Sequence, residues 1–124
     1  MGLLKRGDGG AVDAEIERLS ALPLRDLAAK LLPHVSAFEL KVGVYGPNEF
    51  ELARMLTPSK PSAEQSLQLA PIIAEGLQVL EHAGLVRLNW RSGGGTGIEY
   101  PLTRAGEAAL ADGNVMGRLR DVAG

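Results

Sequence analysis

Residues 80–110, LEHAGLVRLNWRSGGGTGIEYPLTRAGEAAL, contain the pattern that decides the expected fold. A helix is expected to end at Gly84, because glycine commonly adopts the left-handed conformation that terminates helices. Apolar and polar residues then alternate over residues 85–91 and return over 98–102, as in two half-buried strands. The glycine-rich segment 92–97 separates them. The stretch therefore predicts a helix followed by a β-hairpin with its tip at 92–97.

The chain after the hairpin predicts two short helices. Thr103 is placed to cap a helix that contains Glu107 in its first turns. Residues 112–114, Asp-Gly-Asn, should break this helix, and residues 115–122 could form one last short helix.

The longest helix is expected immediately before the hairpin, at residues 62–83. Ser62 and Gln65 have the spacing of a capping box, in which each side chain satisfies a backbone N–H of the other. Pro71 lies inside the run and should kink or split the helix. Its apolar positions are expected to form one buried face: Ala63, Leu67, Ala70, Ile73, Ala74, Leu77 and Leu80.

The first half of the chain predicts two helices, a strand and a third helix. Apolar spacings of three and four indicate a helix at 11–22 and a second that opens at Pro23 and ends near Pro33. Strict alternation over 38–45 indicates a strand. A short helix at 47–56 and a proline-rich loop at 57–61 complete the series.

Composition favours one domain of modest size with a core of aliphatic residues. The chain has 124 residues, 45% of them hydrophobic and only 4% aromatic. Its formal net charge of −2 does not indicate a nucleic-acid-binding protein. It contains no cysteine, which fits a cytoplasmic protein, and no apolar run of the ~18 to 20 residues that a membrane span needs. We expect residues 1–10 to be a flexible tail.

The order of these elements resembles the winged helix-turn-helix domain of MarR- and PadR-type bacterial regulators. The likeness rests on two segments, LEHAGLV at 80–86 and YPLTRAG at 100–106. It implies a mainly α fold with a small β-hairpin (α+β), in which residues 11–111 form a winged-helix domain with an extra N-terminal helix. Residues 112–124 would form a short C-terminal helix or tail. By this resemblance 62–83 is the recognition helix, and 93–97 is the tip of the wing.

The resemblance further implies a DNA-binding transcriptional regulator, commonly a dimer, that binds double-stranded DNA. Arg87, Arg91 and Arg104 would contact phosphates, and Gln65, Ser66 and Gln68 would face the major groove, with Lys60 just before them. Self-association is expected through residues 11–22 or the C-terminal segment.

The charge of the recognition helix points instead to a protein partner. Residues 62–83 contain three acids and no lysine or arginine, and the outward stripe is expected to be Glu64, Gln68, Pro71, Glu75, Gln78 and His82. Carboxylates that face phosphates are repelled. The alternative is a winged-helix protein-protein interaction module that does not bind DNA, with a contact strip of Leu69, Ile72, Glu75 and Val79. A broad core that buries this strip is the other interpretation.

Neither catalysis nor a cofactor is indicated. No nucleophile and base occur in a recognisable pattern, and His34 and His82 lie far apart with no metal-binding spacing. We therefore expect no enzyme, no metal and no cofactor. Trp90 lies on the first strand of the hairpin, and we expect it to be a packing anchor rather than a platform on which bases stack.

Overall fold

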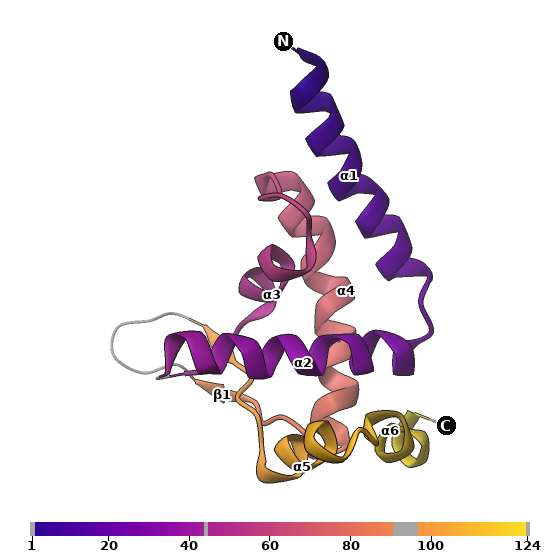
Figure 1. Ribbon diagram of the computed structural model, residues 1–124, viewed down its shortest axis with the longest axis vertical. Coiled ribbons are helices and arrows are strands. Elements are labelled where there is room, and N and C mark those ends of the chain that lie inside the picture. Colours follow the sequence, from indigo (N-terminus) through magenta and orange to yellow (C-terminus); the bar gives the residue numbers. More distant parts are fainter. Residues whose placement is uncertain (1, 44, 91–96, 124) are drawn as a thin grey trace.

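The computed structural model describes residues 2–43, 45–90 and 97–123, with the side chains of 10–43, 45–90 and 97–120. The fold is mainly helical, with one small antiparallel hairpin, as the composition and periodicity predicted (Figure 1). The elements are α1 (Gly2–Ala21), α2 (Leu24–Val42), α3 (Glu49–Leu56), α4 (Ala63–His82), β1 (Asn89–Trp90), β2 (Ile98–Glu99), α5 (Arg104–Asp112) and α6 (Val115–Ala123).

Helix α1 is longer than the sequence pattern indicated. It begins at Gly2, within the segment where we expected a flexible tail. Val12 and Leu19 are fully or almost fully buried, and α1 packs beside α4. The N-terminal part of α1 projects beyond the other elements (Figure 1). Among the side chains of α1 that the structure describes, those from 12 to 19 make the core contacts.

Helix α2 contradicts two predictions at once. It runs through Pro33 to Val42, so no strand forms at 38–45. The helix ends at Gly43, whose φ of +78° is left-handed and whose N–H donates to the Glu39 carbonyl at 2.7 Å. The strand prediction put Leu40 on the buried face, but in the helix Leu40 lies on the solvent side and is 84% exposed.

Both helix-interior prolines lie on the solvent side of their helices. Pro33 and Pro71 are exposed, and neither interrupts its helix in the structure. A proline leaves the carbonyl four residues earlier without its intrahelical donor, and that carbonyl lies on the same face. Water can therefore replace the missing bond, which is why the expected break at Pro33 and the expected split at Pro71 do not occur.

The core is centred where α2 crosses α4. The two helices approach closely at Gly76: a Cβ there would lie 2.6 Å from Leu31 Cδ1 and 3.0 Å from Leu27 Cγ. The buried face of α4 therefore differs from the predicted one. It consists of Leu69, Ile73, Gly76, Leu77 and Leu80. Ala63 and Leu67 are exposed instead, Leu67 to 67%.

Both ends of α4 form as the sequence predicted, and α3 has a capping box that the sequence analysis did not identify. Asn48 and Glu51 make a capping box at the start of α3, and Ser62 and Gln65 make another at the start of α4. At its other end, α4 closes with two paired backbone bonds, Gly84 N–H to the Glu81 carbonyl and Leu85 N–H to the Leu80 carbonyl. This is a Schellman motif, with Gly84 at φ +76°.

The predicted hairpin forms, but its strands are short. Asn89 pairs with Glu99 and Trp90 with Ile98, and an isolated bridge joins Val86 to Leu102. A further backbone bond runs from the Tyr100 N–H to the Pro47 carbonyl at 2.9 Å, so the segment before α3 lies against the second strand. Of the predicted tip, only Gly97 lies within the described residues.

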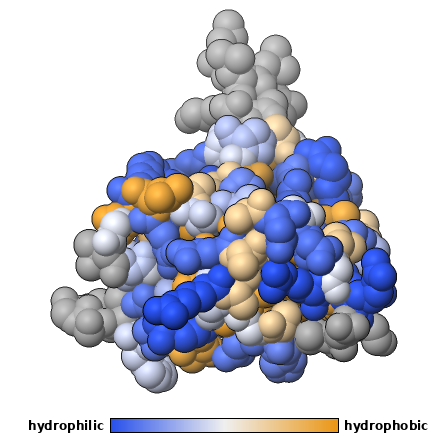
Figure 2. Space-filling model, turned by 60° about the horizontal axis from the view of Figure 1, so that its bottom comes forward, coloured by the Kyte–Doolittle hydropathy of each residue, from blue (hydrophilic) through white to orange (hydrophobic). Residues whose placement is uncertain are grey.

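The last two helices close the fold on one side. Thr103 caps α5 as predicted, and Gly113 ends it in the left-handed conformation. Leu119 of α6 is fully buried, so the C-terminal segment is part of the core. Hydrophilic and apolar side chains are interspersed on the face that carries α5 and α6 (Figure 2).

Candidate functional site

The exposed stripe of α4 is the surface that the sequence singled out. All six predicted outward residues are exposed: Glu64, Gln68, Pro71, Glu75, Gln78 and His82. Leu67 is also exposed, and helical spacing places it in line with Pro71, Ala74 and Gln78. The stripe thus combines apolar positions with carboxylates, and α4 supplies no lysine or arginine to it.

A groove lies between this stripe and the hairpin. It has a volume of about 250 Å³ and is lined by Ala74, Glu75, Gln78, Glu81, Leu88 and Tyr100. Leu88 is 42% exposed there, whereas Tyr100 is buried. The hairpin therefore adds an apolar wall to an acidic helix face.

The ionisation of Tyr100 reflects that acidic surrounding. Burial raises the pKa of Tyr100 above its ordinary value of 10.0, and the negative charges of Glu49 and Glu81 raise that pKa further. Both effects disfavour a phenolate. The groove accordingly favours positively charged groups over negatively charged ones.

The residues predicted to read DNA bases are not all available to do so. The Gln65 side chain accepts the Ser62 N–H through Oε1 at 2.9 Å and donates from Nε2 to Asp13 Oδ1 of α1, also at 2.9 Å. Ser66 is half-buried, whereas Gln68 and Lys60 are exposed. The start of α4 is thus tied to α1 through the residue expected to face the major groove.

The structure does not gather the predicted phosphate-binding arginines beside α4. Successive strand residues point to opposite faces, and Arg87 lines a cavity on the other side of the hairpin from the groove that Leu88 lines. Arg104 is exposed at the first turn of α5. Arg91 lies outside the described residues.

The predicted apolar partner strip is mostly core. Leu69 is fully buried, and Ile72 and Val79 are half-buried and pack against the core. Of the four residues only Glu75 is exposed. The predicted strip is therefore wrong as an exposed apolar surface; the exposed apolar side chains of this part of α4 are Leu67 and Pro71, with Ala74 half-buried between Pro71 and Gln78. Trp90, expected as a packing anchor, is 73% exposed.

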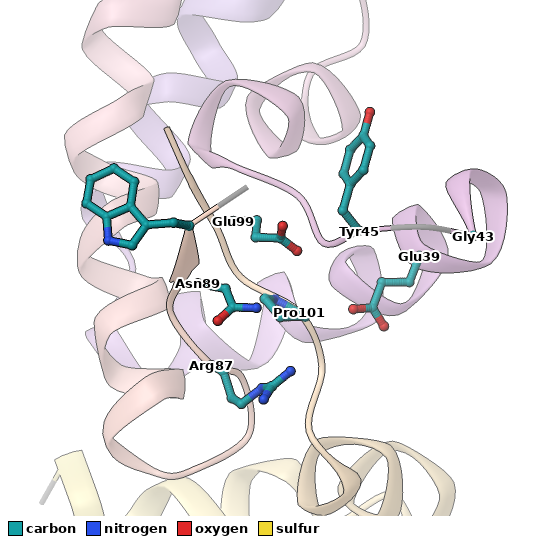
Figure 3. A pocket seen from close by; sticks show the side chains of 8 residues that line it. Glu39, Gly43, Tyr45, Arg87, Asn89, Glu99 and Pro101 are labelled. Atoms are coloured by element: carbon teal, nitrogen blue, oxygen red, sulfur yellow. The ribbon is translucent and has the colours of Figure 1, made fainter. Parts of the chain in front are cut away.

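A second cavity, which the sequence did not indicate, lies between α2 and the hairpin (Figure 3). Its volume is about 400 Å³, and its lining residues are Glu39, Gly43, Tyr45, Arg87, Asn89, Trp90, Glu99 and Pro101. The hairpin register could have indicated that Arg87, Asn89, Glu99 and Pro101 share one face. The approach of Glu39 could not be foreseen, because α2 was expected to end earlier.

In the part of the chain that the structure describes, no three histidine, aspartate or glutamate side chains group as a metal site. Among the same residues, no helix combines the length and apolar character needed to cross a membrane.

Comparisons with known proteins returned nothing: no protein-family model, curated protein or solved structure matches the chain. The proposed function therefore rests on the exposed stripe of α4 and the groove beside the hairpin.

Proposed function

We propose that the protein is a winged-helix module that binds another protein through the face formed by α4 and the hairpin. The succession of α2, α3, α4, hairpin and α5 supports the winged-helix assignment, as does the backbone bond from Tyr100 to the Pro47 carbonyl, which holds the segment before α3 beside the end of the hairpin. The absence of cysteine is compatible with a cytoplasmic location.

The observation that carries the proposal is the chemistry of the exposed α4 face. Leu67, Pro71 and Ala74 form an apolar line, and Glu64, Glu75 and Glu81 flank it. Duplex DNA presents phosphates to any element that enters its grooves, and these carboxylates would repel them. A double-stranded DNA ligand is therefore the competing occupant that this face fits less well.

The partner that fits is a protein segment with apolar side chains flanked by lysine or arginine. Its apolar residues would cover Leu67 and Leu88, and its cations would face Glu75 and Glu81. Complementary charge of this kind sets partner choice and orientation, while the apolar contact contributes affinity.

The proposal is tested with a synthetic helical peptide that carries a leucine stripe flanked by lysines. The full chain should bind it more tightly than two control peptides: one with glutamate in place of lysine, and one with the same charge but scrambled leucines. Glu75→Gln with Glu81→Gln should weaken binding about tenfold, since each exposed charge pair contributes roughly 0.2–1 kcal/mol. The matched control is Glu17→Gln with Glu107→Gln, two exposed acids on α1 and α5.

Equal binding of the scrambled peptide would contradict binding in the groove, because it would show that the net charge of the peptide alone determines the affinity. Tight binding of a mixed-sequence duplex, lost on Arg87→Ala with Arg104→Ala and steeply weakened by salt, would favour the DNA-binding regulator instead.

A further inference from the structure

Glu99 is a buried residue whose carboxylate has no countercharge among the residues that the structure describes. Glu99 is only 7% exposed, and its Oε1 accepts the Gly46 N–H at 2.9 Å. Within the described residues Glu99 makes no ion pair, and its Oε2 has no hydrogen-bond partner. Oε2 is not among the buried side-chain atoms that lack a partner, so it is open to the cavity that Glu99 lines. It can therefore accept a hydrogen bond from a cation in that cavity.

A second carboxylate reaches the same cavity from α2. Glu39 Oε2 accepts the Leu102 N–H at 2.8 Å, and the described residues contain no partner for its other oxygen. In each carboxylate one backbone N–H fixes the orientation, while the other oxygen stays available. Figure 3 shows the Glu39 side chain approaching from the helix and Glu99 from the hairpin, on two sides of Pro101.

Arg87 gives the cavity a positive group that does not neutralise the acids. It lines the same cavity, yet across the described residues it forms no ion pair with Glu39 or Glu99. The cavity thus keeps opposite charges apart on its wall. Tyr45 also lines the cavity. Trp90 alternates with Asn89 along the strand, so its side chain is directed to the face that carries Leu88.

We propose that this cavity binds a small molecule that carries both an ammonium group and a carboxylate, such as a free amino acid. The ammonium would lie at Glu39 and Glu99, and the carboxylate would pair with Arg87. The volume of about 400 Å³ is in the range of small-molecule sites. The site lies on the opposite side of the hairpin from the α4 groove, so it does not depend on the proposed protein partner.

The test is a titration of the isotope-labelled full chain with free amino acids, followed by amide chemical shifts. At least one amino acid should shift the amides of Glu39, Arg87 and Glu99. Its decarboxylated amine and its deaminated acid should each bind at least about tenfold more weakly, because each lacks one charged hydrogen-bonding group. No shift at these amides with any amino acid would overturn the proposal, as would equal affinity of the amine.

Variants separate the two ends of the ligand. Glu99→Gln keeps an oxygen for the Gly46 N–H and should weaken the amino acid at least about tenfold. In Arg87→Ala, the amino acid and its amine should bind alike, since the partner of the carboxylate is gone. Glu39→Gln serves as a second acid variant if Glu99→Gln does not fold. Arg104→Ala and Glu107→Gln are the matched controls on α5. If they weakened amino-acid binding as much as Arg87→Ala and Glu99→Gln do, the proposed site would be contradicted.

Discussion

Gln65 of α4 donates a hydrogen bond of 2.9 Å to Asp13 of α1, while its carbonyl oxygen accepts the Ser62 N–H. One side chain therefore both caps α4 and fastens α1 to it. A glutamine held at both ends of its amide is a poor reader of DNA bases, because it would have to give up two bonds to reach them.

This double role predicts unequal effects for the two partners. Gln65→Ala should lower the free energy of unfolding by about 1–2 kcal/mol, because the capping box and the contact to α1 are both lost. Asp13→Ala should cost less, about 0.5 kcal/mol, since it removes only one exposed bond. Urea denaturation of both single variants and the double variant gives the coupling. Fully additive effects would contradict a direct interaction between Asp13 and Gln65.

Thr103 is expected to contribute more to stability than an ordinary surface threonine. Its hydroxyl donates to the Gly84 carbonyl at 2.6 Å and accepts the Gly106 N–H at 3.0 Å, so it joins the end of α4 to the start of α5. Thr103→Ala should cost about 1–2 kcal/mol, whereas Thr103→Ser should stay within about 0.5 kcal/mol of the wild type. Equal losses in the two variants would show that the methyl group, and not the hydroxyl, is what matters.

Gly106 is required for a close approach between helix and hairpin. A Cβ there would collide with the Leu85 carbonyl oxygen and lie 2.8 Å from Leu102 Cδ1. Gly106→Ala should therefore destabilise the fold by about 2–3 kcal/mol, in spite of the better helix propensity of alanine. Gly10→Ala is the control, because no atom lies within 4 Å of a Cβ at that position of α1. It should leave stability unchanged or raise it by up to about 1 kcal/mol in thermal or urea denaturation.

Tyr100 links the charge of the α4 groove to the pH dependence of stability. Burial, followed by Glu49 and Glu81, raises its pKa above 10.0 in the folded chain. The stability that this contributes is fully present below the unfolded pKa and is lost as the pH rises through the folded one, because the unfolded chain releases the proton first. Alkaline urea denaturation should therefore show a steeper loss for the wild type than for Tyr100→Phe.

The same raised pKa is observable by ultraviolet absorbance. The difference between the alkaline titrations of the wild type and Tyr100→Phe isolates this residue, and its midpoint should lie above 10.0. Glu81→Gln should lower that midpoint. A midpoint at or below 10.0 would contradict the acidic, buried surrounding of the groove.

Local signals with a specific stereochemical meaning were the ones that predicted structure correctly. The capping box of Ser62 and Gln65, the cap at Thr103 and the helix end at Gly84 all form as expected. Each depends on residues no more than a few positions apart, and each has one main structural solution. The existence of the hairpin, though not its register, followed from the same kind of local pattern.

Signals that depend on tertiary packing were the ones that failed. In α4 two apolar stripes overlap, and the sequence did not show that Gly76 lets α2 approach on the side of Leu69 rather than of Leu67. Around Phe38 the apolar residues alternate as in a strand, yet the chain there is helical, because α2 continues until Gly43 ends it. The candidate site changed accordingly: the acidic stripe was predictable, whereas the cavity between Glu39 and Glu99 needed the true length of α2.

We propose that the exposed face of α4 binds a basic, apolar protein segment and not DNA. The most direct measurement compares amide chemical shifts of the full chain during parallel titrations with the leucine-lysine peptide and with a mixed-sequence duplex at physiological salt. We expect the peptide to change the amide chemical shifts of Leu67, Glu75, Gln78 and Leu88, and the duplex to leave them unchanged. Shifts of these amides with the duplex and none with the peptide would contradict it.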